Sequence, residues 1–240
     1  VRGKRFRTGM LDISGELLKE KSALMKLVRL KKDEWFSTGA LRGSIDAIGR
    51  IYKDEGYAYV NITPNTRIDD KSRTVDVNFN IQKGNKVRIG RIEVIGNERT
   101  RDKVIRREVR LYEGEYYSTT ALERSKRLIT RLGYFEPGSV RLQTRRGSTP
   151  DTMDITIEVK EKPTGSFQIG AGFSTVENFV AQAQISQNNL FGRGQTLSFQ
   201  GNFSSIRSIA NIRFFEPYFL DTRLNFGLNL YRFENVYSDF

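Results

Sequence analysis

Apolar and polar residues alternate along the last third of the chain. Positions between the apolar ones are polar or small, as at Gln182, Gln184 and Asn202. A period of two predicts strands with one apolar and one polar face. The apolar positions form five successive runs: Phe167, Ile169, Ala171 and Phe173; Phe179, Ala181, Ala183 and Ile185; Leu197, Phe199 and Phe203; Ala210, Ile212 and Phe214; and Leu224, Phe226, Leu228 and Leu230.

Two kinds of sheet share this alternating pattern. Strands of about ten residues separated by turn residues are typical of a transmembrane β-barrel, apolar toward lipid and polar toward the lumen. A soluble antiparallel sheet that packs on one face alternates in the same way. The pattern favours the barrel. Because the smallest known barrels have about eight strands, five strands predict an incomplete barrel and a chain that is a piece of a longer protein.

The first two thirds of the chain have a different pattern. A strand that ends at Gly15 is followed by a helical run with apolar residues from Leu17 to Val28. Ser37-Thr38 is positioned to cap a second helix, which ends near Gly56, and two strand-like runs follow at 58–68 and 74–81. The predicted order is βααββ, a three-stranded sheet with both helices on one face. Such a sheet has an exposed edge strand that can accept an extended segment of a partner.

The same order returns about 80 residues later. VRLKKDEWFSTGAL (Val28–Leu41) reappears as VRLYEGEYYSTTAL (Val109–Leu122), a displacement of 81 positions. After a short change of length, VDVNFNI (Val75–Ile81) faces MDITIEV (Met153–Val159). The chain therefore contains two copies of one α+β module. We predict three domains, at 1–84, 85–164 and 165–240.

Charge changes at the second of these boundaries. Residues 165–240 contain five basic and five acidic residues, so the net charge of +12 lies entirely within the two repeats. A basic run there could be interpreted as a nucleic-acid stripe. Glu98, Asp102 and Glu108 interrupt the run, and no aromatic residue is interleaved within it, which favours a solvated helix face. Attraction of the run to an anionic membrane surface ranks between these two interpretations. The run consists of Arg99, Arg101, Lys103, Arg106, Arg107 and Arg110.

The sequence predicts no enzyme, cofactor or metal site. It contains neither Cys nor His, which excludes a thiol nucleophile, an imidazole base and a Cys/His zinc site. Gly170-Ala171-Gly172 and Gly192-Arg193-Gly194 do not complete a nucleotide-binding GxGxxG pattern. The acidic pair Asp69-Asp70 lies in a predicted hairpin loop, where turn chemistry explains it.

Four further stretches of the chain stand out in order. They are VRIGRIEVIGNERTRDKVIRREVRLYEGEYYSTTALERSKRLITRLGYFE (Val87–Glu136), GAGFST (Gly170–Thr175), NNLFGRGQ (Asn188–Gln195) and FEPYF (Phe215–Phe219). With these stretches in this order, the chain resembles the BamA family of outer-membrane proteins, which combines POTRA domains with a transmembrane β-barrel. In this resemblance residues 1–84 are the penultimate POTRA, 85–164 the final POTRA and 165–240 the first barrel strands.

The resemblance implies a function and a location. It implies a protein of the outer membrane of a Gram-negative bacterium, with its POTRA domains in the periplasm, that assembles and inserts other β-barrel proteins without a cofactor. The implied partners are outer-membrane lipoproteins of the assembly complex, unfolded β-barrel clients and outer-membrane lipid, and not nucleic acid. Two alternatives remain: a transporter of the same superfamily, of the two-partner-secretion type, and a soluble periplasmic scaffold.

The resemblance also implies two sites. Arg106 and Glu113, in RREVRLYEG, match the charged positions that contact a lipoprotein. The first barrel strand, at a seam that opens to template a client strand, would be 165–174, with Gly165, Phe167, Gly170 and Gly172. The sequence agrees in part, because a glycine-rich strand is weak and holds its register poorly. The ordinary alternative for Arg106 and Glu113 is a pair of solvated charges.

Overall fold

The computed structural model describes residues 5–235. Residues 1–4 and 236–240, at the outer ends of the first and last predicted domains, lie outside that range. The chain divides into two compact units. One holds the chain up to Glu93 together with Val109–Ser125 and Leu142–Thr156, and the other holds Val94–Glu108, Lys126–Arg141 and the chain from Ile157 onward. The boundary between the units runs through the second repeat.

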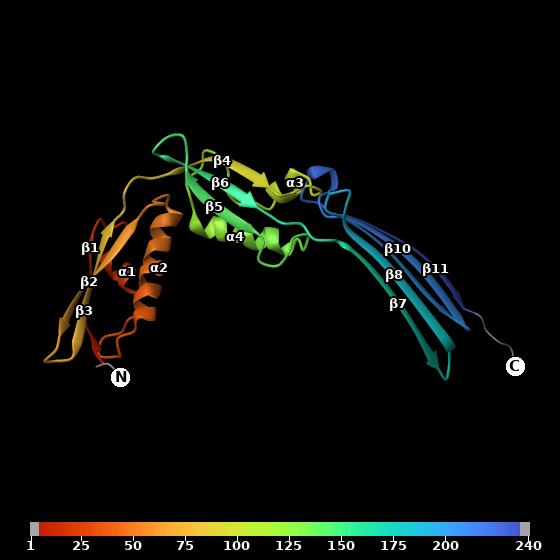
Figure 1. Ribbon diagram of the computed structural model, residues 1–240, viewed down its shortest axis with the longest axis horizontal. Coiled ribbons are helices and arrows are strands. Elements are labelled where there is room, and N and C mark those ends of the chain that lie inside the picture. Colours follow the sequence, from red (N-terminus) through yellow and green to blue (C-terminus); the bar gives the residue numbers. More distant parts are fainter. Residues whose placement is uncertain (1–4, 236–240) are drawn as a thin grey trace. The chain divides into compact units, whose positions relative to one another are not determined.

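The first repeat has the predicted βααββ order (Figure 1). Strand β3 lies in the middle of the sheet, parallel to β1 and antiparallel to β2. The two outer strands, β1 and β2, are therefore the edges of this sheet. The elements are β1 (Arg7–Gly15), α1 (Lys21–Met25), α2 (Thr38–Asp54), β2 (Asn61–Asp69) and β3 (Thr74–Gln82).

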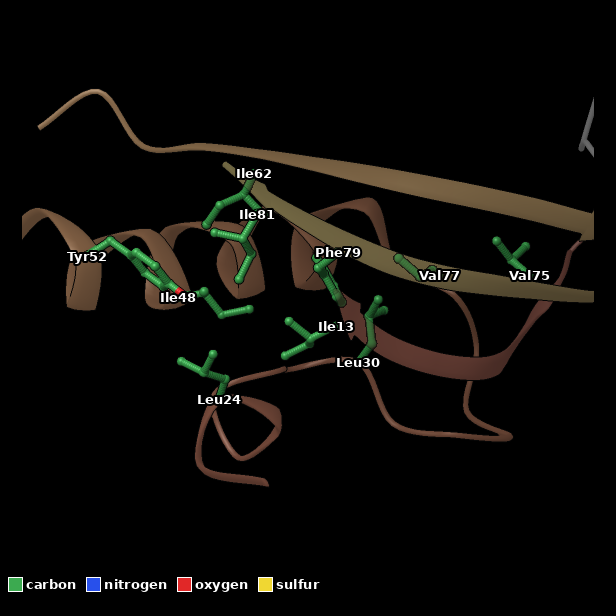
Figure 2. Packing of buried hydrophobic residues seen from close by; sticks show 10 residues of the cluster. All are labelled: Ile13, Leu24, Leu30, Ile48, Tyr52, Ile62, Val75, Val77, Phe79 and Ile81. Carbon is green, nitrogen blue, oxygen red and sulfur yellow. The ribbon is translucent and has the colours of Figure 1, made fainter. Parts of the chain in front are cut away.

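The core of the first repeat lies between its helices and its sheet. Alternate residues of β3 point toward α2, as Val77, Phe79 and Ile81 do in Figure 2. From α2, Ile48 and Tyr52 meet them and are fully buried. The α2 residues follow a helical spacing and the β3 residues a spacing of two, so the two periodicities in the sequence give the two walls of one core.

The first helix is much shorter than the apolar run from Leu17 to Val28 predicts. Helix α1 has five residues, and the chain then turns so that Leu30 enters the core at 5% exposure. A polar contact fixes this turn: the Arg29 N–H donates to the buried hydroxyl of Ser44 at 2.8 Å. The apolar spacing thus reflects burial of a non-helical segment.

The second repeat has the same order of elements, which confirms the predicted repeat. Its sheet has the order β4-β6-β5, equivalent to β1-β3-β2. The elements are β4 (Arg88–Ile95), α3 (Asp102–Arg106), α4 (Thr119–Arg131), β5 (Arg141–Arg146) and β6 (Thr152–Glu158).

Residues that recur at the 81-residue displacement have the same local role in both copies. Ser125 repeats the contact of Ser44: it accepts from the N–H of Arg110 at 2.8 Å and donates to Ala121. Gly15 and Gly96 both have positive φ, +96° and +83°, and a Cβ at either would collide with a carbonyl oxygen of the neighbouring strand. The residues that are identical in the two copies therefore mark buried hydroxyl contacts and close backbone approaches.

The last part of the described chain is one antiparallel sheet of five strands in the order β11-β10-β9-β8-β7. Successive strands are neighbours, as in a meander. The sheet does not close, in agreement with the predicted incomplete barrel. The strands are β7 (Gly165–Ser174), β8 (Asn178–Leu190), β9 (Gln195–Ser204), β10 (Arg207–Glu216) and β11 (Phe226–Asn235), with a short 3-10 turn at Phe219–Asp221 before β11.

Substitution of Gly15 tests the close approach of β1 to β3. Gly15→Ala places a Cβ against the Ile81 carbonyl in a left-handed conformation, and we expect it to lower the free energy of unfolding of this repeat by about 3 kcal/mol. Gly84→Ala is the matched control, because Gly84 has φ +67° with nothing within 4 Å and should lose only about 1–2 kcal/mol. Urea unfolding followed by the fluorescence of Trp35, the chain's single tryptophan, measures both. Equal losses would contradict the clash.

Candidate functional site

One face of the five-stranded sheet is apolar from edge to edge. Cross-strand pairing places Phe167 beside Ile185, Ile185 beside Phe199, Phe199 beside Ile212 and Ile212 beside Leu230. Their exposed fractions are 64%, 52%, 39%, 45% and 56%. A contiguous exposed apolar surface of this kind marks an interaction with a partner or a membrane. Alternation on every strand is what a lipid-facing barrel wall requires.

The opposite face is polar. Ser166 pairs with Ser186, and Ser186 with Ser198. A second row runs through Gln168, Gln184, Gln200 and Asn211. The polar row lies one residue away from the apolar row on each strand, so a shift of register by one residue would exchange the two faces.

Strand β7 is an edge of this sheet. Its ten residues pair with β8 from Gly165 to Ser174 without a bulge, and among the described strands none pairs with its other side. Gly165 and Phe167 lie in the apolar rows and are exposed. Gly170 and Gly172 belong to the polar face, where the side chain of Gln182 covers Gly170 and nothing lies within 4 Å of a Cβ at Gly172. The β7 edge thus offers main-chain groups that no described strand pairs, and its polar face has no side chain at Gly170 and Gly172.

The turn between β8 and β9 docks on the segment that precedes α3. Asn189 is 8% exposed and bridges two partners: its amide donates to the Thr100 hydroxyl at 2.8 Å and its oxygen accepts from the Gly194 N–H at 2.9 Å. The Arg101 N–H donates to the Gly192 carbonyl at 3.0 Å. A Cβ at Gly192 would collide with the Arg99 carbonyl. The stretch NNLFGRGQ therefore serves as a docking turn, and its glycines permit the close approach.

A second contact joins the end of α3 to the loop after β10. The Tyr218 hydroxyl donates to Glu108 at 2.9 Å, and the guanidinium of Arg107 lies 4.0 Å from the centre of the Tyr218 ring. Glu108 is 8% exposed, and the pairing compensates the cost of burying its charge. Lys103 adds an ion pair with Asp221 at 2.7 Å. Two separate turns of the sheet thus hold the same α3 segment.

The two repeats also contact each other, at a joint whose residues all belong to the first unit. Asp54, at the end of α2, accepts from the Thr120 N–H at 2.8 Å, the Thr120 hydroxyl at 2.6 Å and the Ser118 hydroxyl at 2.9 Å. The carboxylate thereby caps the N-terminus of α4 from the neighbouring repeat. Arg50 pairs with Glu123 at 3.2 Å beside it. The end of one long helix meets the start of the next through complementary charges.

Comparison with known families decides the assignment. The model of POTRA, the surface antigen variable number repeat, matches residues 6–84 and 87–162, and the Omp85 superfamily domain matches 189–240. The chain belongs to the POTRA–Omp85 family. This confirms the resemblance and the fold of two POTRA-like α+β domains followed by an antiparallel sheet. Such a protein lies in the outer membrane of a Gram-negative bacterium, with its POTRA domains in the periplasm.

Curated relatives and a solved structure agree with this assignment. The chain is 32% identical over 95% of its length to the outer membrane protein assembly factor BamA of Neisseria meningitidis, and 33% identical over 99% to that of Nitratidesulfovibrio vulgaris. It spans 29% and 30% of those relatives. The crystal structure of Haemophilus ducreyi BamA lacking POTRA domains 1-3 matches 96% of the chain with a TM-score of 0.82 and 27% identity, and the match covers 43% of that structure.

The two predicted lipoprotein-contact residues have different local environments. Arg106 is on α3, where its guanidinium pairs with Asp102 one turn earlier at 2.8 Å. Glu113, in the other unit, accepts from the Ile92 N–H at 2.9 Å and so ties the loop after α3 to β4. Their lipoprotein role stays a prediction, as do the domain bounds. The structure adds a local structural role for Glu113.

Sequence reasoning missed the docking turn, the Tyr218 contact and the Asp54 cap. Of the predicted basic run, Lys103, Arg106 and Arg107 contact groups of the chain itself. Within residues 5–235, no cluster of acidic residues is suited to hold a metal ion. No helix in that range is long and apolar enough to cross a membrane.

The POTRA joint should respond to acid. Partial burial by itself raises the pKa of Asp54, but hydrogen bonds from Thr120 and Ser118 outweigh it and lower the pKa. A lowered pKa stabilises the joint above the ordinary aspartate value of about 3.9 and the contribution is lost as pH falls through the lowered value. We expect hydrogen-exchange protection of the Thr120 amide, measured by NMR, to fall below about pH 4.

The control is the neighbouring amide of Ala121, which bonds Ser118 within its own repeat at 3.2 Å and should keep its protection. Asp54→Asn should remove the acid step at Thr120. Persistence of that step in Asp54→Asn would show that another group titrates.

Proposed function

We propose that the protein carrying this chain assembles and inserts β-barrel proteins in the outer membrane. One observation carries the proposal: a sheet with an exposed apolar face ends at β7, a glycine-containing strand whose outer edge has no partner among the described strands. Relatives named outer membrane protein assembly factors support it. The alternation suits the sheet to outer-membrane lipid.

The mechanism follows from main-chain hydrogen bonding. A client strand that enters the bilayer must pair its N–H and C=O groups, because lipid offers them no partner. Pairing with the β7 edge supplies these bonds with little demand on the client's sequence. Small residues at Gly170 and Gly172 weaken the strand, which favours exchange of partners at the seam. The step makes and breaks hydrogen bonds only, so the role is not enzymatic.

The POTRA domains are proposed to hold clients and lipoproteins on the periplasmic side. Each repeat ends its sheet with an outer strand, β2 or β5, to which an extended client segment can add. Arg106 and Glu113 are the proposed charged contacts with an assembly lipoprotein. Arg106 lies on α3, and Glu113 lies in the loop that follows, where it bonds the Ile92 N–H of β4.

Cysteine crosslinking tests the β7 edge, because the chain has no native cysteine. Ser166→Cys, in β7, should form a disulfide with a cysteine in the terminal strand of a client during assembly by the intact protein in lipid vesicles. Ser198→Cys is the control: it belongs to the same polar row, but β9 has neighbours on both sides. Gel analysis should show the adduct for Ser166→Cys alone. Equal adducts at both positions, or none at Ser166, would argue against templating at β7.

A charge series tests the lipoprotein contact. Glu113→Lys and Glu113→Gln should each weaken binding of the cognate lipoprotein about tenfold, because both remove the negative charge. The Gln variant keeps an oxygen for the Ile92 N–H, which separates charge from local structure. Glu115→Lys, at a neighbouring exposed position, should bind as the unaltered protein does. Titration calorimetry measures the affinities, and unchanged binding by Glu113→Lys refutes the contact.

A further inference from the structure

A small cationic cleft lies at the end of the five-stranded sheet, where the turns of the sheet hold α3. The cleft has a volume of about 280 Å³, and all of its residues belong to the second unit. Three segments line it: the start of α3, the turn between β8 and β9, and the loop between β10 and β11. Its lining contains four basic residues, Arg101, Lys103, Arg107 and Arg193, and two acidic residues, Glu216 and Asp221.

Both carboxylates of the cleft are already engaged. Asp221 forms the ion pair with Lys103 at 2.7 Å. Glu216 accepts from the side-chain amide of Gln195 at 2.6 Å and from the Tyr218 N–H at 3.0 Å. These contacts hold the loop after β10 in place and leave an excess of positive charge in the cleft.

Two arginines account for this excess. In the part of the chain that the structure describes, no acidic group pairs with the side chain of Arg101 or of Arg193, and both residues are exposed. A backbone hydrogen bond brings them to the same cleft, because the Arg101 N–H donates at 3.0 Å to the carbonyl of Gly192, the residue before Arg193. Like charges held together repel, and an anion between them would relieve that repulsion.

The most buried basic residue of the cleft is Arg107, which stacks on an aromatic ring. Its guanidinium lies 4.0 Å from the centre of the Tyr218 ring, and the Tyr218 hydroxyl donates to the buried carboxylate of Glu108. The stacking contact gives the guanidinium plane a fixed setting. Planar guanidinium groups bind phosphate oxygens through parallel N–H groups, so three arginines around one cleft suit a phosphate group.

The cleft also has an apolar rim. Leu220 lines it and is 79% exposed, at a φ of +54° that leucine rarely adopts. Phe191, in the same turn as Arg193, is 78% exposed. Exposed apolar side chains beside basic ones, at the end of a sheet with an apolar face, are typical of the boundary between lipid headgroups and acyl chains. A strained conformation kept at such a position points to a function.

We propose that this cleft binds the phosphodiester headgroup of an anionic phospholipid, in the leaflet that faces the periplasm. The guanidinium groups of Arg101 and Arg193 bind the phosphate oxygens, and Leu220 contacts the acyl chains. The exposed leucine favours lipid over a free phosphate or an acidic peptide, since neither offers acyl chains. The inference rests on the proposed setting of the sheet in lipid. It makes a bound lipid part of the attachment between α3 and the β8–β9 turn.

Photocrosslinking of the intact protein in vesicles tests the proposal. The vesicles contain phosphatidylcholine and phosphatidylglycerol in known proportion. Leu220→p-benzoylphenylalanine captures lipid at the cleft, and mass spectrometry of the adducts identifies their headgroups. We expect phosphatidylglycerol to exceed its share of the bilayer about fivefold among these adducts. Leu228→p-benzoylphenylalanine, at an exposed apolar position of β11, is the position control, and its adducts should match the bilayer composition.

Removal of the two arginines tests the cause of the enrichment. Arg101→Gln combined with Arg193→Gln should return the Leu220 adducts to the bilayer composition. The matched control is Lys126→Gln combined with Arg131→Gln, at exposed positions of α4 in the same unit. It removes the same charge outside the cleft and should leave the enrichment unchanged. Unchanged Leu228 adducts show that the sheet of each variant is still inserted.

A soluble competitor distinguishes lipid from a free phosphate. A millimolar excess of glycerol 3-phosphate, which has the phosphate without acyl chains, should leave the enrichment unchanged. Loss of the lipid adducts in its presence would make a free phosphate the ligand. A Leu220 adduct to protein in place of lipid would make the ligand an acidic segment of a partner.

The remaining outcomes separate the cleft from the proposed function. Enrichment that survives loss of Arg101 and Arg193, or that is lost equally in the α4 variant, overturns the proposed site. Adducts of bilayer composition at both Leu220 and Leu228 overturn the cleft alone. Absence of lipid adducts at Leu228 would contradict the setting of the sheet in lipid, and with it both the cleft and the proposed function.

Discussion

Unpaired main-chain groups at sheet edges are the constraint on which this chain is built. Each POTRA sheet and the five-stranded sheet has two edge strands, and an edge either stays in water or finds a partner. In lipid the first option does not exist. The long sheet combines a lipid-compatible face with the β7 edge, so its architecture is satisfied only by further strands. The unpaired main-chain groups of β7 leave the sheet incomplete. The same groups suit it to pairing with a strand of another chain.

Rigid attachment gives this edge a defined setting within its unit. The buried amide of Asn189 and the buried carboxylate of Glu108 are both satisfied across the boundary between α3 and the sheet turns. Breaking either contact would leave a polar group buried and unpaired, which costs more than the bond itself contributes. The basic segment before and within α3 thus has a structural role in holding the turns of the five-stranded sheet, in addition to any role toward partners.

Periodicity predicted the parts of the fold that depend on local burial. The βααββ order, the two faces of strands β7 to β11 and the repeat relation all follow from spacings of two, of 3.6 and of 81. The predicted length of α1 was wrong, because Leu30 reaches the core from a turn and its position mimics helical spacing. The docking turn and the Tyr218–Glu108 contact were invisible, since they join residues 89 and 110 positions apart and leave no local pattern. The stretches NNLFGRGQ and FEPYF, which contain the docking turn and Tyr218, were noted in the sequence, but nothing in them named their partners.

Repeats of similar sequence carry a risk of their own, because an unfinished module can pair with the wrong neighbour while the chain folds. The position shared by Arg42 and Glu123 has opposite charge in the two copies. The helix end that carries Arg50 meets a negative charge at the start of the next module, whereas the start of its own module carries a positive charge at the equivalent position. The sign of the charge at this one position therefore distinguishes the starts of the two modules. The difference lies at the solvent-exposed rim and leaves the shared core unaltered.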